Sequence, residues 1–223
     1  MRTRVKICCM ASPSEVRAAA VAGADAIGAV GPMPSGPGPI DDEWAKTVIA
    51  AAPPGVTPFL LTSEHSAEGV LRHLAATHAP VVQLVRHLDP RVHAEIRAAA
   101  PWVKIVQVIH VEGEEAIELA RGYAMISDAL LLDSGNPAAG GEVEELGGTG
   151  RRHDWAISRR IVQLVDKPVW LAGGLTEGNV ADAIAQVRPF GLDLCSGVRT
   201  MGKLDQRKLT SFFAAIRSAE RTI

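Results

Sequence analysis

Apolar and polar positions follow a repeating unit along the chain: a short apolar run, a loop, and a segment with helical spacing. Residues 130–133 (Leu-Leu-Leu-Asp) illustrate the apolar run, and Ser12, Pro13 and Gly23 are placed to start and end the first helix. The pattern predicts strand and helix in alternation. We expect strands at 5–9, 26–30, 57–61, 81–85, 103–109, 130–133, 168–172 and 191–195, and helices at 13–22, 41–52, 67–77, 91–99, 114–121, 155–165, 179–187 and 206–218.

Continuous apolar strands imply burial on both faces, as in parallel sheets, and strict alternation with helices favours right-handed βαβ units. Eight such pairs in 223 residues predict an α/β fold, the (β/α)₈ TIM barrel. A doubly wound sheet is the structural alternative, but it uses fewer strands and a Gly-x-Gly-x-x-Gly turn that the sequence lacks. Because no linker or shift in composition divides the chain, we expect residues 1–223 to form a single domain.

Composition and charge narrow the class of partner. Hydrophobic residues make up 47% of the chain and charged residues 22%, as in a globular protein with a sizeable core. The net charge is −2, and basic and acidic residues are interspersed along the chain. The sequence therefore has no concentration of positive charge of the kind that binds nucleic acid or an anionic membrane. The start of the chain holds only a short apolar run, and no stretch reaches the roughly 18 apolar residues of a membrane span. We therefore expect a cytoplasmic protein with a small-molecule partner.

The chain has three cysteines, Cys8, Cys9 and Cys195. An odd number, two of them adjacent, makes no disulfide framework and fits a reducing compartment. There is no Cys-x-x-Cys pair and no helical His pair at i, i+4, so no metal site is predicted.

In a barrel, catalytic side chains lie at the C-terminal ends of the strands. Cys8, Gln83, His110 and Asp133 occupy such positions. A cysteine in an apolar strand is most often an inert hydrophobe, and the two-residue period of a strand predicts that Cys9 points away from the mouth that Cys8 faces. Asp133 closes an apolar run, where an unpaired carboxylate is costly, so it is either functional or a cap of the following loop or helix.

Glycine-containing turns follow the last two predicted strands. They are Gly173-Gly174 and Ser196-Gly197. Missing side chains allow backbone N–H groups to approach an anion, and this is the usual place of a barrel phosphate site. The alternative is that these glycines only permit tight turns.

Several short motifs occur together in one order over nearly the whole chain. They are Lys6-Ile7-Cys8, Asp133-Ser134, the Gly-Gly-Thr-Gly run at 147–150 with Asp154-Trp155, the Leu-Ala-Gly-Gly-Leu run at 171–175 with Asn179-Val180, and Asp193 with the Ser-Gly-Val run at 196–198. Together they resemble the phosphoribosylanthranilate isomerase family of tryptophan biosynthesis. The resemblance implies a (β/α)₈ barrel without a cofactor that performs an Amadori rearrangement of an N-phosphoribosyl arylamine into a 1-amino-1-deoxyribulose phosphate.

The resemblance also implies roles for single residues. Cys8 matches the general base of the family and Asp133 its general acid. The acid protonates the ring oxygen to open the furanose, and the base removes the proton at C2. A thiol serves as this base only with a lowered pKa, for which Lys6 or a nearby dipole is a candidate cause.

The remaining matches concern substrate binding. Residues 147–150 are expected to cover the sugar phosphate, with Asp154 capping the next helix. Gly174, Ser196 and Gly197 match the phosphate-binding turns of the family. Gln83 matches a polar residue at the C-terminal end of the fourth strand.

The sequence departs from the family pattern around the aryl end of the substrate. The loop at 32–39 lacks the arginine that binds the anthranilate carboxylate in the family. Cys9 occupies a position where the family usually has a glycine, and Cys195 one where it has a serine. Arg86, in place of the glycine of a common His-Gly pair, is expected to bind substrate, and Arg86 or Arg199 could supply the missing charge.

We consider three functions. Phosphoribosylanthranilate is the default substrate; a related N-phosphoribosyl amine is the alternative that the altered loop suggests; a non-catalytic phosphosugar-binding barrel is the third. In each case the partner is a small phosphosugar, and the protein is a monomer or a homodimer.

Overall fold

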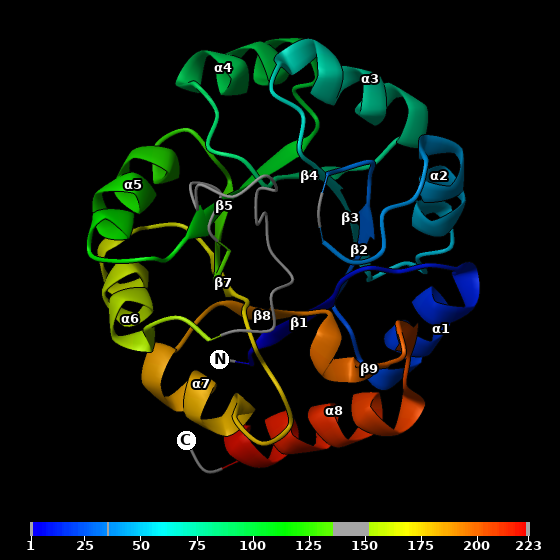
Figure 1. The fold of residues 1–223 in the computed structure, drawn as a ribbon, viewed down its shortest axis with the longest axis vertical. Helices are drawn as coiled ribbons and strands as arrows, with labels where there is room; N and C mark the ends of the chain where they lie inside the picture. The colour runs from blue at the N-terminus through cyan, green and yellow to red at the C-terminus, as the bar shows by residue number, and fades with distance from the viewer. Residues whose placement is uncertain (1, 35, 136–151, 222–223) are drawn as a thin grey trace.

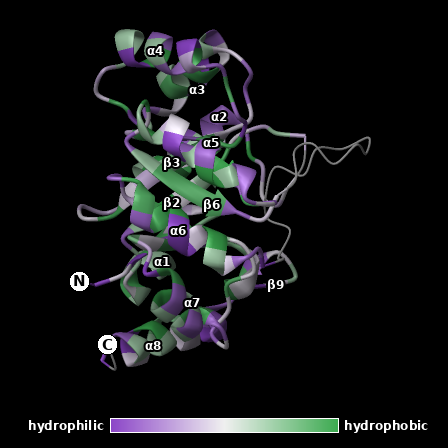
Figure 2. Cartoon of the chain, turned by 90° about the vertical axis from the view of Figure 1, so that its left-hand side faces the viewer, coloured by the Kyte–Doolittle hydropathy of each residue, from purple (hydrophilic) through white to green (hydrophobic). Residues whose placement is uncertain are grey.

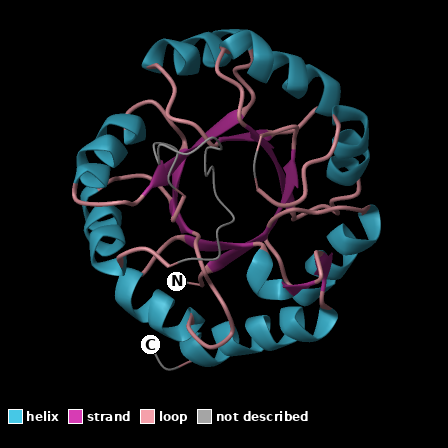
Figure 3. Ribbon diagram, viewed as in Figure 1, coloured by secondary structure: helices cyan, strands magenta, loops and turns pink. Residues whose placement is uncertain are grey.

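Eight parallel strands form a closed ring with the helices outside it, as Figures 1 and 3 show. The computed structural model describes residues 2–34, 36–135 and 152–221. The strands follow one another in chain order, and β8 pairs with β1 to close the barrel. They are β1 (Arg4–Ile7), β2 (Ala26–Val30), β3 (Thr57–Thr62), β4 (Val81–Leu84), β5 (Lys104–His110), β6 (Ala129–Asp133), β7 (Val169–Leu171) and β8 (Gly191–Leu194). The predicted (β/α)₈ barrel is confirmed.

A helix follows each strand, and the capping residues explain where several of them begin. Ser12 accepts a hydrogen bond from the Glu15 N–H, and Asp154 accepts one from the Ala156 N–H, as predicted for both caps. The helices are α1 (Pro13–Ala22), α2 (Asp42–Ala50), α3 (Ala67–Thr77), α4 (Pro90–Ala99), α5 (Glu115–Ala124), α6 (Trp155–Leu164), α7 (Val180–Val187) and α8 (Gln206–Glu220).

The strands at the closure of the barrel end earlier than the sequence predicts. β1 ends at Ile7 and β8 at Leu194, so all three cysteines lie just beyond strands. A 3-10 helix, η1 (Ser196–Val198), and a hairpin of β9 (Arg199–Thr200) and β10 (Lys203–Leu204) then precede α8. Elements of two or three residues are too short to show a hydrophobic period, which is why the sequence did not predict them.

The core has two layers separated by the sheet. Side chains such as Ile27, Leu60 and Leu132 pack between strands and helices, whereas Phe59 and Trp170 meet edge to face inside the barrel, 5.9 Å apart. The side view in Figure 2 places both chain termini at one face of the ring and β9 at the other. No helix in the described ranges is long and apolar enough to cross a membrane. That residues 1–223 form one domain stays a prediction.

Candidate active site

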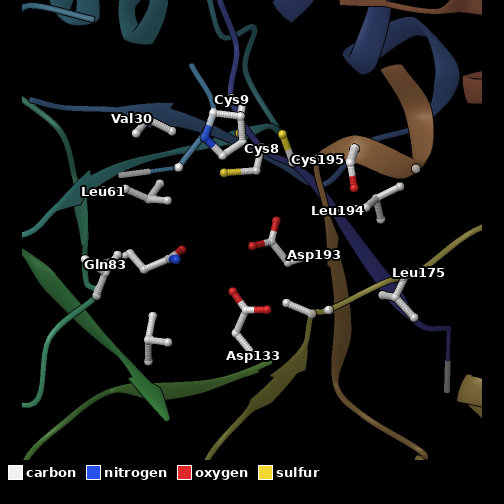
Figure 4. A pocket seen from close by; sticks show the side chains of 18 of the residues that line it. Cys8, Cys9, Val30, Leu61, Gln83, Asp133, Leu175, Asp193, Leu194 and Cys195 are labelled. Carbon is white, nitrogen blue, oxygen red and sulfur yellow. The ribbon is translucent and has the colours of Figure 1, made fainter. Parts of the chain in front are cut away.

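A pocket lies at the C-terminal ends of the strands and holds about 730 Å³ of empty space that is continuous with solvent. Side chains from opposite sides of the barrel point into it, as Figure 4 shows. The residues that line it are Cys8, Cys9, Val30, Met33, Gly36, Pro37, Leu61, Gln83, Val85, Val108, Asp133, Ala172, Gly173, Gly174, Leu175, Asp193, Leu194, Cys195, Ser196 and Gly197. This is the face at which barrel enzymes carry their catalytic residues.

Cys8 enters the pocket from the end of β1, as predicted. Its N–H donates to the Leu194 carbonyl at 2.8 Å, which continues the β1–β8 ladder by one residue. Gly28 on β2 leaves room for the thiol, because a Cβ at that position would lie 2.9 Å from Cys8 Sγ. The location of the sulfur therefore depends on the two strands that flank β1.

Cys9 also lines the pocket, so the prediction that it points away is wrong. Its φ of 61° is left-handed, and this reverses the alternation expected of a continuing strand. Arg199 fixes this turn: its Nη2 donates to the carbonyls of Cys8 (3.3 Å) and Cys9. Glu15 on α1 accepts from the same guanidinium at 2.9 Å and 3.2 Å, so a buried ion pair fixes the backbone that carries the thiols.

A buried ion pair lies beneath the thiols. Lys6 and Asp193 are opposite one another in the β1–β8 ladder, and Lys6 Nζ donates to Asp193 Oδ2 at 2.9 Å. The Lys6 side chain is 0% exposed and lies over the Phe59 ring, 5.3 Å from its centre. Burial lowers the pKa of Lys6, but Asp193 and Cys8 outweigh burial, and the net shift is upward. Lys6 therefore remains a cation inside the barrel.

The environment of Cys8 favours its thiolate. A hydrogen bond from Cys9 lowers the pKa of the Cys8 thiol, burial opposes that shift, and the Lys6 charge adds to it, with a net lowering. Hydrogen bonds with Cys195 and Cys8, together with burial, raise the pKa of Cys9. One of two adjacent thiols is thus prepared to lose its proton while the other keeps it. Lys6 was the predicted cause, and Cys9 is the contribution that the sequence did not reveal.

Asp133 stands across the pocket from Cys8, at the end of β6, with Asp193 between them in the view of Figure 4. Its Oδ1 accepts from the Ser134 N–H at 2.7 Å. Gln83, on β4, is 3% exposed, and its Oε1 has no hydrogen-bond partner among the described residues. The structure therefore brings the predicted Cys8, Gln83 and Asp133 together.

Sequence reasoning did not select Asp193 as a pocket residue. Its Oδ1 is buried without a hydrogen-bond partner in the described part of the chain, while Oδ2 meets Lys6. The signal was present in the run Leu192-Asp193-Leu194, where the strand period places the carboxylate inside if the leucines face the helices.

The predicted phosphate turns form one wall of the pocket. Gly173 and Gly174 have φ values of 86° and 62°, which a side chain would strain. A Cβ on Gly197 would overlap the Leu175 carbonyl oxygen, so a side chain does not fit there either. Lys208 on α8 lines an adjoining hollow with Gly174, Ser196 and Gly197, and its Nζ donates to the Arg199 carbonyl at 2.7 Å. Bare backbone and a nearby cation are what an anion site requires.

Other predicted positions lie elsewhere. Arg86 is not among the lining residues, and its Nε donates to the Ser63 carbonyl at 2.7 Å. Arg199 faces Glu15 and the cysteine carbonyls instead of the pocket. His110 belongs to β5, is buried, and is not part of the lining. Residues 147–150 lie outside the described residues.

The wall near the loop after β2 is apolar, with Val30, Met33, Pro37 and Leu61. No lysine or arginine of the described residues lines the main pocket. Within those residues there is also no group of three or more His, Cys, Asp or Glu arranged to hold a metal ion.

Comparison with known proteins decides the family. The family model described as N-(5'phosphoribosyl)anthranilate (PRA) isomerase matches residues 5–215. The chain belongs to this family. A phosphoribosylanthranilate isomerase from Halobacterium salinarum is 40% identical over 218 residues, covering 95% of this chain and 94% of the relative.

Solved structures of phosphoribosylanthranilate isomerases have the same fold. The enzyme from Thermus thermophilus superposes with a TM-score of 0.80 at 28% identity and covers 97% of this chain and 99% of its own. A second structure is a complex of the isomerase with reduced 1-(o-carboxyphenylamino)-1-deoxyribulose 5-phosphate, with a TM-score of 0.78, 26% identity and the same coverage. Each match spans nearly both chains, so family and fold extend over the whole barrel.

Proposed function

We propose that this protein converts N-(5-phosphoribosyl)anthranilate into 1-(o-carboxyphenylamino)-1-deoxyribulose 5-phosphate, with Cys8 as general base and Asp133 as general acid. The observation that carries the assignment of these roles is a thiol with a lowered pKa facing a carboxyl group across one pocket. A binding protein needs no such pair, so the non-catalytic alternative is the weaker one.

The reaction requires two proton transfers on a bound aminoaldose. Asp133 donates a proton to the ring oxygen, and the furanose opens to an iminium ion. The Cys8 thiolate then removes the proton from C2, and the resulting enolamine tautomerises to the ketone. Lys6 and the Cys9 thiol favour the ionised form of Cys8, since both lower its pKa. Arg199 holds the turn so that Cys8 stays aimed at the substrate.

The phosphate is bound by the wall built from Gly174, Ser196 and Gly197. These residues present backbone without bulky side chains to the pocket and to the adjoining hollow. Lys208 adds a positive charge at that hollow. This orientation places the sugar carbons between Cys8 and Asp133 and directs the aryl group to the apolar wall near Met33 and Pro37.

The aryl wall favours a second candidate, an isomerase of a related N-phosphoribosyl amine without a carboxylate. Among the described residues no cation lines that wall, and Arg199 is committed to Glu15. Arg86 lies outside this lining, where its Nε donates to the Ser63 carbonyl, and it stays our proposed ligand only for a substrate that carries a carboxylate. A substrate without that group would need no such ligand.

We further propose that the protein acts in the cytoplasm as a monomer or homodimer on a phosphosugar. The reduced cysteines and the mixed surface charge support this location. A phosphoribosylanthranilate isomerase of Thermotoga maritima with the same fold is described as dimeric.

The test is turnover of phosphoribosylanthranilate by the purified protein, followed by loss of the fluorescence of the substrate. Turnover that inorganic phosphate inhibits competitively is the expected result. Absence of turnover, with tight binding of the reduced deoxyribulose phosphate product analogue, would transfer the assignment to a related amine. Absence of both would refute the proposed function.

A further inference from the structure

Three thiols lie together at the closure of the barrel, where the sequence predicted that only one of Cys8 and Cys9 would face the pocket. Ile7 is opposite Leu194 in the β1–β8 ladder, so Cys8 and Cys195 are the next neighbours across it. Neighbouring strands are about 4.8 Å apart. Cys9 follows Cys8 directly, all three residues line the same pocket, and the other two sulfurs raise the pKa of the Cys9 thiol. All three are free, and Figure 4 shows them grouped at one corner of the pocket.

The position of Cys9 is not explained by its backbone. A φ of 61° suits glycine and disfavours a residue with a side chain. The Cys9 and Cys195 side chains nevertheless lie beside one another at this corner of the pocket. A side chain that strains its own backbone to lie beside another thiol indicates a shared chemical role.

The sulfur of Cys8 lies toward Gly28 on β2, where a Cβ would be 2.9 Å away, whereas Cys195 follows β8 on the opposite side of β1. Both of the other thiols affect the pKa of Cys9. This placement favours an exchange of the sulfur–sulfur bond between Cys8 and Cys195 that passes through Cys9.

We propose that Cys9 and Cys195 form a thiol relay that removes oxidising equivalents from Cys8 and stores them as a Cys9–Cys195 disulfide. The oxidant is a hydroperoxide, which is small enough to enter the pocket that all three residues line. The relay keeps the thiol that we assign as the base from irreversible oxidation.

The Cys8 thiolate attacks hydrogen peroxide, one oxygen is transferred to give Cys8 sulfenic acid, and hydroxide leaves with the electron pair of the O–O bond. The Cys9 thiolate attacks the sulfenic sulfur, and the oxygen leaves as water. The Cys195 thiolate then attacks Cys9, and the Cys8 thiolate leaves. In sum, two thiols and one hydrogen peroxide give one disulfide and two waters.

The electrostatics agree with this order. Cys8 has the lowered pKa and is the first thiol to react. The Cys8 thiolate is one of the groups that raise the pKa of Cys9, and oxidation of Cys8 removes that charge, so Cys9 loses its proton more readily and can attack. Adjacent residues are only about 3.8 Å apart at Cα, below the usual disulfide range of about 4.4 to 6.8 Å. A Cys8–Cys9 bond is therefore strained and is readily passed to Cys195.

The experiment treats the reduced full-length protein with equimolar hydrogen peroxide, alkylates the remaining thiols, and maps the products by mass spectrometry. In the wild type we expect a Cys9–Cys195 bridge, an alkylated Cys8, and full return of both thiols with dithiothreitol. With a second equivalent of hydrogen peroxide, Cys9→Gly, which suits the local φ, should lose the bridge and accumulate Cys8 sulfinic acid that dithiothreitol does not reverse. Cys195→Ser should lose the bridge and stop at the strained Cys8–Cys9 disulfide, which dithiothreitol reduces. Cys8→Ser should form the bridge more slowly.

Three results would overturn the relay. They are a wild-type bridge that retains Cys8, equal accumulation of Cys8 sulfinic acid in the wild type and in Cys9→Gly at the same dose of peroxide, and bridge formation that Cys8→Ser does not slow. The relay rests on the proposed function only for the reason that Cys8 needs protection. The experiment detects the relay by the masses of the thiol products and does not use turnover. A protein that forms the bridge but does not turn over the substrate refutes the proposed function alone.

Discussion

Replacing Lys6 with methionine tests the buried ion pair on which the site is built. The change removes a charge from a fully buried position but keeps a flexible side chain of similar volume over Phe59. Asp193 is then left without its partner in the barrel interior. Burial raises the pKa of Asp193 and Lys6 opposes this shift only in part, so the net shift is upward even with Lys6 present. Without Lys6 we expect the pKa to rise further and Asp193 to be protonated in the folded variant.

The magnitude follows from proton linkage. An unfolded aspartate has a pKa of about 3.9, so keeping it protonated in the folded state at pH 7 costs at most about 4 kcal/mol, and at pH 5 about 1.5 kcal/mol. A folded-state pKa above the unfolded one gives a penalty that is absent below about pH 4 and grows by about 1.4 kcal/mol for each further pH unit. Breaking buried pairs typically costs about 3 to 5 kcal/mol, which agrees with the neutral-pH value.

The assay is urea unfolding followed by far-ultraviolet circular dichroism at pH 5, 6 and 7. Lys46→Met, at an exposed position of α2, is the matched control and should change stability by less than about 0.5 kcal/mol at each pH. In Lys6→Met/Asp193→Asn the deficit should become independent of pH, because no carboxyl group remains to titrate. A deficit in Lys6→Met below about 1 kcal/mol, or one equal at pH 5 and 7, would refute this reasoning.

Two further predictions concern the phosphate wall and the pH dependence of stability. Gly197→Ala should raise KM about tenfold or more, because the new Cβ displaces the Leu175 carbonyl and the turn with it. Gly122→Ala, which has open space around its Cβ, is the control and should leave KM unchanged. Equal KM values in the two variants would contradict the phosphate assignment. Burial lowers the pKa of His153 to about 4, so its stabilisation is complete above about pH 6.5 and is lost as the pH falls toward 4. Between about pH 6.5 and pH 4 the free energy of unfolding, measured with urea, should fall by up to about 3 kcal/mol more in the wild type than in His153→Gln. Equal falls in the two proteins would contradict this prediction.

The sequence was sufficient for the architecture because the barrel repeats one local pattern. The run at Leu130–Leu132 and the caps at Ser12 and Asp154 each act within a few residues, and the structure has them as predicted. The ends of the strands were harder to predict. Cys9 was assigned to the wrong side because β1 stops at Ile7 and the chain turns through a left-handed residue.

The parts of the site that sequence could not reveal depend on contacts between distant residues. Lys6 and Asp193 are 187 positions apart, and Glu15 and Arg199 are 184 apart. Both pairs exist only because the first and last strands close the ring. The comparison with the family pattern offered Arg199, beside Arg86, as a charge available to substrate, whereas the closed barrel engages Arg199 with Glu15 and the cysteine carbonyls.

The central claim is that Cys8 and Asp133 act as base and acid across one pocket. The most direct measurement is kcat/KM for phosphoribosylanthranilate in the wild type, Cys8→Ala and Asp133→Asn, with circular dichroism to show that each variant is folded. Each substitution should lower kcat/KM by about 10² to 10⁴. The double variant should fall less than the product of the two effects, since the groups act in one reaction. Turnover undiminished in either folded single variant would contradict the account.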